Sequence, residues 1–221
     1  MLDNKVRYLQ IAFNRDLTQL YSLLPKIPQS SRIFIEAGTP FIKREGIAGI
    51  AAIRSLWSGE IVADLKISDG ASGEVDLAYQ AGATAVTALG GAPRETLNIF
   101  TSRCKEFGMS SIIDMLGVDE PLKVLLRLKN LPSVVVLHKG RDEELSRGKT
   151  IPYRQVNKIK SKFDILISAA GGIDLHSARS AIFNGANIVI ANIVSSYDGL
   201  GGIGEGEDIG SIAKEFLKTI E

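Results

Sequence analysis

The sequence predicts an α/β protein with one domain, a (β/α)8 or TIM barrel that spans residues 1–221. Short apolar, β-branched runs recur eight times with amphipathic segments between them, which is the alternation expected of a parallel β/α fold. The runs are apolar throughout, as in strands that are buried on both faces. An open, doubly wound sheet is the alternative, because periodicity alone does not establish that the sheet closes.

Each expected strand is a short run rich in Ile, Val, Leu and Ala. In order, the eight runs are Tyr8–Phe13, Ile33–Glu36, Ile61–Lys66, Ala85–Ala88, Ser111–Met115, Val134–His138, Ile165–Ser168 and Ile188–Ala191. Gly82, Gly108 and Gly185 mark points where a helix ends before the next strand. The helices with the clearest amphipathic pattern are Gly73–Gln80, Pro93–Phe107, Asp119–Leu128, Leu175–Phe183 and, at the end of the chain, Ile209–Ile220. The glycine-rich segment Gly199–Gly206 is interpreted as a loop.

The composition is typical of a soluble protein of the cytoplasm. Its 26 basic and 25 acidic residues nearly balance, so neither nucleic acid nor an anionic membrane is an expected partner. The N-terminal segment lacks the apolar core of a signal peptide, and every apolar run is shorter than a membrane span. Cys104 is the single cysteine, which excludes a disulfide framework, and we expect it to be a small, buried or half-buried residue.

Polar residues stand at the carboxyl ends of most of the expected strands. In a barrel those ends meet at one face, where active sites lie. One such residue has a purely structural explanation, but their repetition favours a functional site. The candidate residues are Asn14, Glu36, Asp64, Lys66, Asp69, Asp114, His138 and Arg141, together with Gly171, Gly172, Ala191 and Asn192 after the last two strands.

Asp64 and Lys66 form the most informative pair. Side chains alternate along a strand, so these two point the same way, and Asp69 follows just before the turn at Gly70. The carboxylates favour a protonated Lys66, which is then able to stabilise an oxyanion. The alternative is a weakly stabilising surface salt bridge.

Glu36 and Asp64 are expected on adjacent strands and suit Mg2+. This ion takes one or two protein carboxylates together with water and substrate oxygens. A transition metal fits less well, because the candidate set contains no thiolate and a single imidazole. The alternative for Glu36 is a helix cap or an ion pair with Lys43 or Arg44.

His138 ends an apolar strand and is therefore placed to enter the site. Its pKa near neutrality suits proton transfer, although a structural hydrogen bond is the alternative. His176 opens a helical segment, and we expect it to be structural or exposed.

Ala170–Asp174 is interpreted as a glycine-rich turn that leads into a helix, with Asp174 as the N-cap. Glycines let backbone N–H groups approach an anion, and barrels often bind phosphate after strands seven and eight. The basic stretch Lys158–Lys162 is interpreted as a solvated helix face.

These motifs resemble the orotidine-monophosphate-decarboxylase superfamily. Within it they are most similar to 3-hexulose-6-phosphate synthase and 3-keto-L-gulonate-6-phosphate decarboxylase. The resemblance covers most of the chain, and the second and third matching segments together are the most specific. The matching segments are Leu9–Asn14, Ile35–Gly46, Asp64–Asp69, His138–Asp142, Ala170–Ile173 and Gly185–Ile190.

The resemblance implies a phosphorylated keto-sugar substrate and a homodimer with active sites shared across its interface. It implies Mg2+ held by Glu36 and Asp64, and an enediolate stabilised by that metal and by Lys66. His138 would transfer the proton, and Asp69 would reach across the dimer.

Of the activities in this superfamily, we rank first an aldolase that adds formaldehyde to ribulose 5-phosphate, or catalyses the reverse. Asp114 and Ala170 resemble the synthase, whereas Arg141 resembles the decarboxylase of 3-keto-L-gulonate 6-phosphate, which is the alternative. Orotidine-monophosphate decarboxylase activity ranks third, because Ala169–Gly172 is shorter than the phosphate loop of those enzymes.

Two departures from the family pattern bear on catalysis, and the second also bears on phosphate binding. Asn14 stands where the first strand of the family ends in Asp, and Ala191-Asn192 stands where a Gly-Arg pair usually binds phosphate. Replacing that Arg removes a bidentate, charge-assisted contact. Phosphate affinity is then expected either to be lower or to be supplied by Arg141, Lys139 or the Gly199–Gly206 segment. The alternative from another class is a barrel that binds a sugar phosphate without turning it over.

Overall fold

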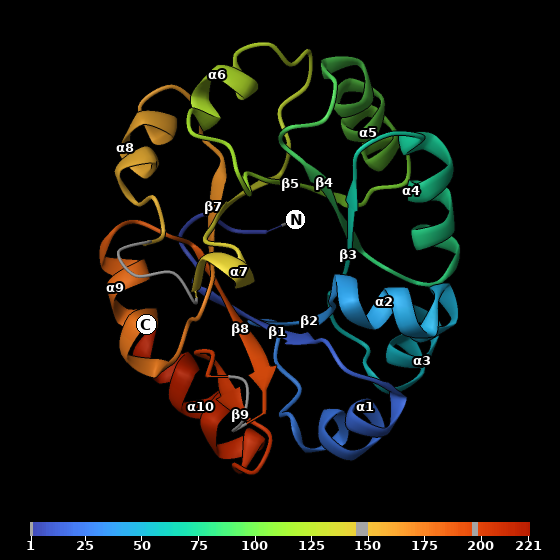
Figure 1. Ribbon diagram of the computed structural model, residues 1–221, viewed down its shortest axis with the longest axis vertical. Helices are drawn as coiled ribbons and strands as arrows, with labels where there is room; N and C mark the ends of the chain where they lie inside the picture. Colours follow the sequence, from blue (N-terminus) through green and yellow to red (C-terminus); the bar gives the residue numbers. More distant parts are fainter. Residues whose placement is uncertain (1, 145–149, 196–198) are drawn as a thin grey trace.

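The computed structural model describes residues 2–144, 150–195 and 199–221, and these ranges form a closed barrel. Its parallel strands follow one another in sequence order, and β1 also pairs with β8, which closes the sheet and excludes the open alternative. Figure 1 shows the helices arranged as a ring around the strands. The barrel strands are β1 Tyr8–Phe13, β2 Ile33–Ala37, β3 Ile61–Ile67, β4 Ala85–Leu89, β5 Ser110–Asp114, β6 Val134–His138, β7 Leu166–Ala170 and β8 Ile188–Val194.

The helices lie mostly on the outside and connect successive strands. They are α1 Leu17–Leu23, α2 Thr39–Glu45, α3 Ile47–Leu56, α4 Ala71–Gln80, α5 Arg94–Glu106, α6 Pro121–Leu125, α7 Arg141–Glu144, α8 Arg154–Lys160, α9 Leu175–Phe183 and α10 Ile209–Thr219. Asp174 accepts a hydrogen bond of 2.8 Å from the Ser177 N–H in a capping box, which confirms its predicted role at the start of α9.

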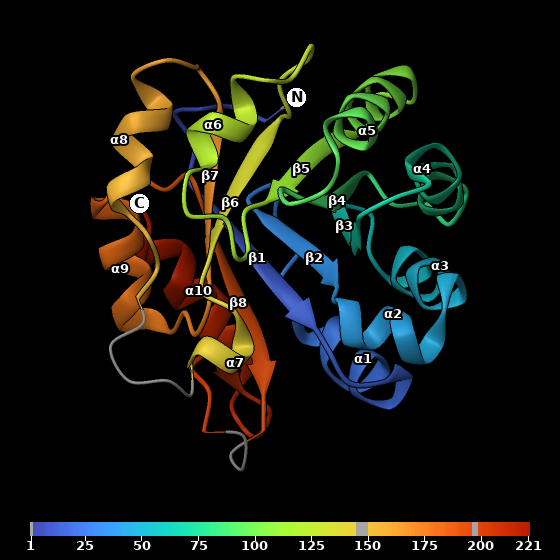
Figure 2. The same ribbon diagram turned by 45° about the horizontal axis from the view of Figure 1, so that its top comes forward.

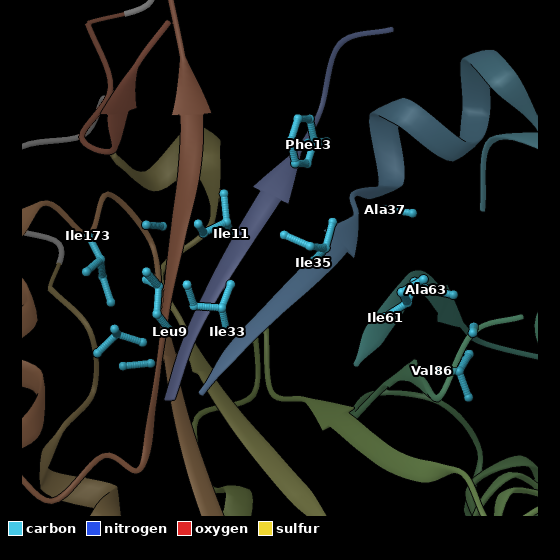
Figure 3. Close-up of a cluster of buried hydrophobic side chains, with 14 of the residues drawn as sticks. Leu9, Ile11, Phe13, Ile33, Ile35, Ala37, Ile61, Ala63, Val86 and Ile173 are labelled. Carbon is cyan, nitrogen blue, oxygen red and sulfur yellow. The ribbon is translucent and has the colours of Figure 1, made fainter. Parts of the chain in front are cut away.

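Two apolar cores result from the alternation of side chains along the strands. The larger lies between the sheet and the helices, and Figure 3 shows Leu9, Ile11 and Phe13 of β1 beside Ile33 and Ile35 of β2 in this layer. The smaller fills the amino end of the barrel interior, where the rings of Tyr8 and Phe34 stack 4.9 Å apart. Polar inward-facing residues follow at the carboxyl end. The barrel interior therefore has an apolar layer at its amino end and a polar layer at its carboxyl end.

Several elements differ from the sequence-based expectation. Helices α1, α2, α3, α7 and α8 were not among those with a clear pattern, because most are short and some begin with glycine or proline signals. Helix α6 is shorter than predicted, since the chain tightens after Leu125 and the Leu128 N–H bonds back to the Leu125 carbonyl. The segment interpreted as a loop contains a two-residue strand, β9 Ile203–Gly204, that pairs with the end of β8.

Cys104 is buried, as predicted, and burial raises the pKa of its thiol to about 12. His176 is exposed on α9. Across the described residues, none of the helices combines the length and apolar character that crossing a bilayer requires.

Candidate active site

A cavity of about 350 Å³ opens at the carboxyl end of the strands. Figure 2 shows the tips of β1, β2 and β8 at this end of the barrel, near α7. Nine of the twelve predicted site residues line it: Asn14, Glu36, Asp64, Lys66, Asp114, His138, Arg141, Gly171 and Asn192. The fold therefore brings together residues from both ends of the chain, because parallel strands of a closed barrel all end at one face.

Three predicted residues lie elsewhere. Ala191 is buried in the outer core, on the face of β8 opposite to Asn192. Gly172 lies next to Gly171 but is not part of the cavity wall. Asp69 is exposed beyond the end of β3, where its Oδ1 accepts a 2.8 Å hydrogen bond from the Gly70 N–H. Within one chain, Asp69 does not reach the cavity.

Lys66 is held between two carboxylates. Its Nζ lies 3.0 Å from Asp64 Oδ2 and 2.7 Å from Asp114 Oδ2. Burial lowers the pKa of the ammonium, but the two carboxylates outweigh burial, so the pKa lies above its ordinary value. Lys66 therefore remains a cation, and the predicted Asp64–Lys66 pair is a buried network rather than a surface salt bridge.

Asp114 links Lys66 to His138. Its Oδ2 lies 2.8 Å from His138 Nδ1. Burial opposes ionisation of Asp114, yet the charges of and hydrogen bonds from His138 and Lys66 bring its pKa down to about 2. For His138, burial lowers the pKa and the adjacent Asp114 carboxylate raises it further than burial lowers it. Asp114 thus orients the imidazole and favours its protonated form.

Glu36 is one of three buried acids in the site, with 7 % of its surface exposed. Burial and the negative charge of Asp64 raise its pKa to about 7, while a hydrogen bond from Gln10 Nε2 opposes the increase. Two carboxylates close enough to disturb each other favour a shared cation. Among the described residues, no group of three or more His, Cys, Asp or Glu side chains is arranged to hold a metal ion, in this cavity or elsewhere. The pair Glu36 and Asp64 fits Mg2+, which uses one or two protein carboxylates and completes its shell with water and substrate.

Two threonines that the sequence analysis did not single out orient Asp64. Thr39 Oγ1, at the start of α2, lies 2.7 Å from Asp64 Oδ2, and Thr87 Oγ1 on β4 lies 2.8 Å from Asp64 Oδ1. The sequence does contain an indication that Thr87 has a role in the site, since Thr87 is the one polar residue in the otherwise apolar strand Ala85–Leu89.

The two residues that depart from the family pattern contact each other. Asn14 Nδ2 donates a 3.0 Å hydrogen bond to Asn192 Oδ1 across the junction of β1 and β8. Where the family resemblance implies an acidic and a basic residue, this chain has two neutral amides. The cavity wall at this point therefore carries no formal charge.

The glycine turn after β7 holds an internal carboxylate. Gly172 has a φ of +65°, and a methyl group on it would come within 2.6 Å of Glu144 Oε2. A methyl group on Gly201 would come within 2.5 Å of the Gly172 carbonyl, and the Gly201 N–H donates to Glu144. The backbone around this turn thus accommodates an anionic group, and Glu144 at the end of α7 supplies one.

Comparison with protein families gives one match over most of the chain. Residues 7–192 match the model of the orotidine 5′-phosphate decarboxylase / HUMPS family. The bifunctional enzyme Fae/Hps of Methanothrix thermoacetophila is 35% identical over 216 residues, which is 97% of this chain and 53% of that protein. The chain therefore spans about half the length of this curated relative.

Solved structures of related enzymes share the fold. The 3-hexulose-6-phosphate synthase of Salmonella typhimurium superposes with a TM-score of 0.83 and 27% identity, covering 96% of this chain and 98% of that one. The 3-keto-L-gulonate-6-phosphate decarboxylase of Vibrio cholerae superposes with a TM-score of 0.72 at 22% identity, covering 97% of each chain. The second likeness shows the fold alone.

Proposed function

Since the chain belongs to the orotidine 5′-phosphate decarboxylase / HUMPS family, we propose that it is a 3-hexulose-6-phosphate synthase-like aldolase that joins formaldehyde to ribulose 5-phosphate, or catalyses the reverse reaction. The observation that carries the proposal is the position of Lys66. Its ammonium lies between Asp64 and Asp114, in a cavity that Glu36 and His138 also line. A cation held there is aimed at negative charge that develops on substrate oxygens.

The substrate binds with its sugar in the barrel mouth and its phosphate at the glycine turn. Gly171 lines the cavity after β7, and Arg141 at the start of α7 lines it from the neighbouring loop after β6. Arg141 supplies a positive charge and a planar set of donors suited to a phosphate. The neutral pair Asn14 and Asn192 hydrogen-bonds to hydroxyl groups rather than to the phosphate.

His138 carries the proton in this mechanism. In the direction of addition, the deprotonated form of His138 takes the C1 proton of ribulose 5-phosphate at Nε2. The Asp114 carboxylate stabilises the imidazolium that forms, and Lys66 stabilises the resulting negative charge on oxygen. The C1 carbon then forms a bond to the carbon of formaldehyde. The formaldehyde oxygen takes the proton back from the imidazolium of His138, so no proton is gained or lost overall.

Glu36 and Asp64 would hold Mg2+, which supplies positive charge beside the substrate oxygens when it is bound. The raised pKa of Glu36 supports this assignment, because a bound dication would stabilise the ionised form that burial and Asp64 disfavour.

The direct test is release of formaldehyde from hexulose 6-phosphate by the purified chain, with Mg2+ and with a chelator. We expect Mg2+-dependent release that Lys66→Ala abolishes while the circular dichroism spectrum stays that of the wild type. Lys105→Ala, an exposed lysine on α5, is the matched control and should retain full activity. Absence of release by the wild-type chain in Mg2+ would refute the aldolase proposal.

Decarboxylation of 3-keto-L-gulonate 6-phosphate is the second candidate, and the position of Arg141 in the cavity wall favours it. The same preparation incubated with that substrate should evolve no CO2 if the aldolase assignment is correct. Binding of ribulose 5-phosphate in a thermal-shift assay, without turnover in either assay, would instead identify a sugar-phosphate-binding barrel.

We also propose that the chain acts as a homodimer in the cytoplasm, with Asp69 of each subunit completing the site of the other. The exposure of Asp69 supports this, since the carboxylate lies outside its own cavity with a local hydrogen bond to the Gly70 N–H. The predicted absence of nucleic-acid and membrane partners is retained as part of this proposal.

A further inference from the structure

Strand β3 does not pair regularly with β4 at the candidate site. Ala63 pairs with Val86, and the next paired residues are Ile67 and Ala88. Between these two pairs, β3 contains Asp64, Leu65 and Lys66, whereas β4 contains Thr87 alone. Strand β3 therefore arches away from β4 between Asp64 and Lys66. This bulge changes the direction of their side chains.

Lys66 has a backbone conformation that residues with side chains rarely adopt. Its φ is +50°, and it is the only residue other than glycine with a positive φ in the described ranges. Left-handed geometry at such a residue persists only where surrounding contacts enforce it. Residues with such geometry are often found at active sites.

The hydroxyl of Thr87 supplies a hydrogen-bond acceptor for the backbone of the arched segment. The backbone N–H of Lys66 has no strand carbonyl opposite it and donates instead to Thr87 Oγ1 at 2.9 Å. The same hydroxyl lies 2.8 Å from Asp64 Oδ1, and Thr87 is 4 % exposed. Because the hydroxyl accepts from Lys66, its single proton is free to be donated to the carboxylate.

We propose that Thr87 is a positioning residue that sets the Lys66 ammonium and the Asp64 carboxylate for the reaction. This inference rests on the proposed aldolase function for its kinetic consequence, but its structural part does not. Without the hydroxyl, the Lys66 N–H would be buried without an acceptor and Asp64 would lose a donor. The arch would then relax, and the Lys66 Nζ would leave its place between Asp64 and Asp114.

Three variants separate positioning from general stability. Thr87→Val removes the hydroxyl at constant shape, and Thr87→Ser keeps it. Thr101→Val is the matched control, because Thr101 is equally buried and its hydroxyl bonds to the Leu97 carbonyl within α5, away from the cavity. We expect Thr87→Val to lower kcat about tenfold to a hundredfold with little change in KM. Thr87→Ser and Thr101→Val should stay within about twofold of the wild type.

A second measurement is independent of turnover and of metal. In a chelator, the chain is labelled with limiting acetic anhydride and the extent of acetylation at Lys66 is read by peptide mass spectrometry. Wild-type Lys66, which is held between the Asp64 and Asp114 carboxylates, should react slowly. Thr87→Val should increase its acetylation several-fold, and neither Thr87→Ser nor Thr101→Val should do so. Exposed Lys105 gives the reference rate in every sample.

The results of these two measurements distinguish failure of the Thr87 proposal from failure of the aldolase proposal. Wild-type kcat and wild-type Lys66 acetylation in Thr87→Val would overturn the positioning role, as would an equal loss in Thr87→Ser. If the wild-type chain shows no aldolase activity, the proposed function fails while the acetylation comparison still decides the role of Thr87. If Thr87→Val does not fold, Thr87→Cys replaces it, because a thiol is a weak hydrogen-bonding group of similar size. The same increase in Lys66 acetylation is then expected.

Discussion

At the scale of single residues, the site is a chain of charges that each depend on the next. Glu36, Asp64 and Asp114 are buried acids, and Lys66 and His138 are the basic groups that face them. Buried charges are tolerated when they are paired and hydrogen-bonded. Changing one member should therefore alter the titration of its neighbours, and two predictions follow this logic.

The first concerns Asp114 and the imidazole of His138. In Asp114→Asn, the carboxylate that raises the pKa of His138 is gone while burial still lowers it, so the pKa should fall below its ordinary value of 6.5. A proton-NMR titration of the metal-free protein measures this directly. The chain has two histidines, so exposed His176 provides the reference signal. An unchanged His138 titration would show that Asp114 does not control it.

The second concerns the cost of burying Glu36. Because its pKa is about 7 in the folded chain and 4.5 ordinarily, the folded state binds this proton more tightly than the unfolded state. Wild-type stability should therefore fall as the pH rises from about 4.5 to about 7. Glu36→Gln lacks this dependence and should be about 3 kcal/mol more stable relative to the wild type at pH 8 than at pH 4.

Urea unfolding of both proteins in a chelator at the two pH values gives this difference. Glu215→Gln, an exposed acid on α10, is the control and should show no such change. A stability difference between Glu36→Gln and wild type that is the same at both pH values would contradict the buried titration.

At the scale of elements, α7 is the unpredicted helix that bears most directly on the candidate site. This short helix follows β6 and lies inside the ring of outer helices in Figure 1. It presents Arg141 to the cavity and sets Glu144 against the glycine turn after β7. Helix α7 therefore supplies a cation, Arg141, that can bind a phosphate. It also supplies a carboxylate, Glu144, at the position where that phosphate would lie.

Removing the charge of Glu144 should strengthen binding of anions at the turn. A carboxylate a few ångströms from a bound phosphate costs about 1 kcal/mol in a water-like environment, so Glu144→Gln should lower the Kd of inorganic phosphate roughly fivefold. Isothermal titration calorimetry of the full chain measures this Kd.

Glu215→Gln changes the net charge equally and lies on α10, so its Kd should match that of the wild type. Weaker phosphate binding by Glu144→Gln would mean that Glu144 supports the turn instead of competing with the anion.

At the scale of the whole molecule, closure of the barrel creates the site. Pairing of β1 with β8 places Asn14 beside Asn192, two residues separated by 178 positions in the chain. The contact between the two ends of the cavity wall depends on this pairing, since an open sheet would leave β1 and β8 apart. The proposed dimer extends the same principle, because the carboxylate of Asp69 would complete the cavity of a second chain.

Mixed dimers test the shared site. Lys66→Ala and Asp69→Ala should each be inactive alone. Co-expressed in equal amounts, half of the dimers contain one subunit of each kind, and one of their two sites is intact, so about a quarter of wild-type activity should return. Separately tagged subunits allow purification of the mixed dimer for the formaldehyde-release assay. No recovery in a purified mixed dimer would exclude sharing of Asp69.

The sequence by itself determined the class of fold and most of the strand positions. Eight apolar runs and the polar residues that follow them are local patterns, and burial on both faces requires such runs. The common face of Glu36, Asp64, Lys66, Asp114 and His138 followed once those strands were arranged as a barrel. Asp174 as a helix N-cap and the burial of Cys104 were likewise predictable, because each depends on its near neighbours or on residue type.

Only the tertiary structure decided how these residues are held. The arch of β3 over Thr87, the Asn14–Asn192 hydrogen bond and the carboxylate of Glu144 at the glycine turn each join segments that are distant in the chain. No local pattern specifies such contacts, since they depend on strand register and on closure of the sheet. The residue types therefore determine the chemistry of the candidate site. The way the barrel brings its strand ends together determines the geometry of that site.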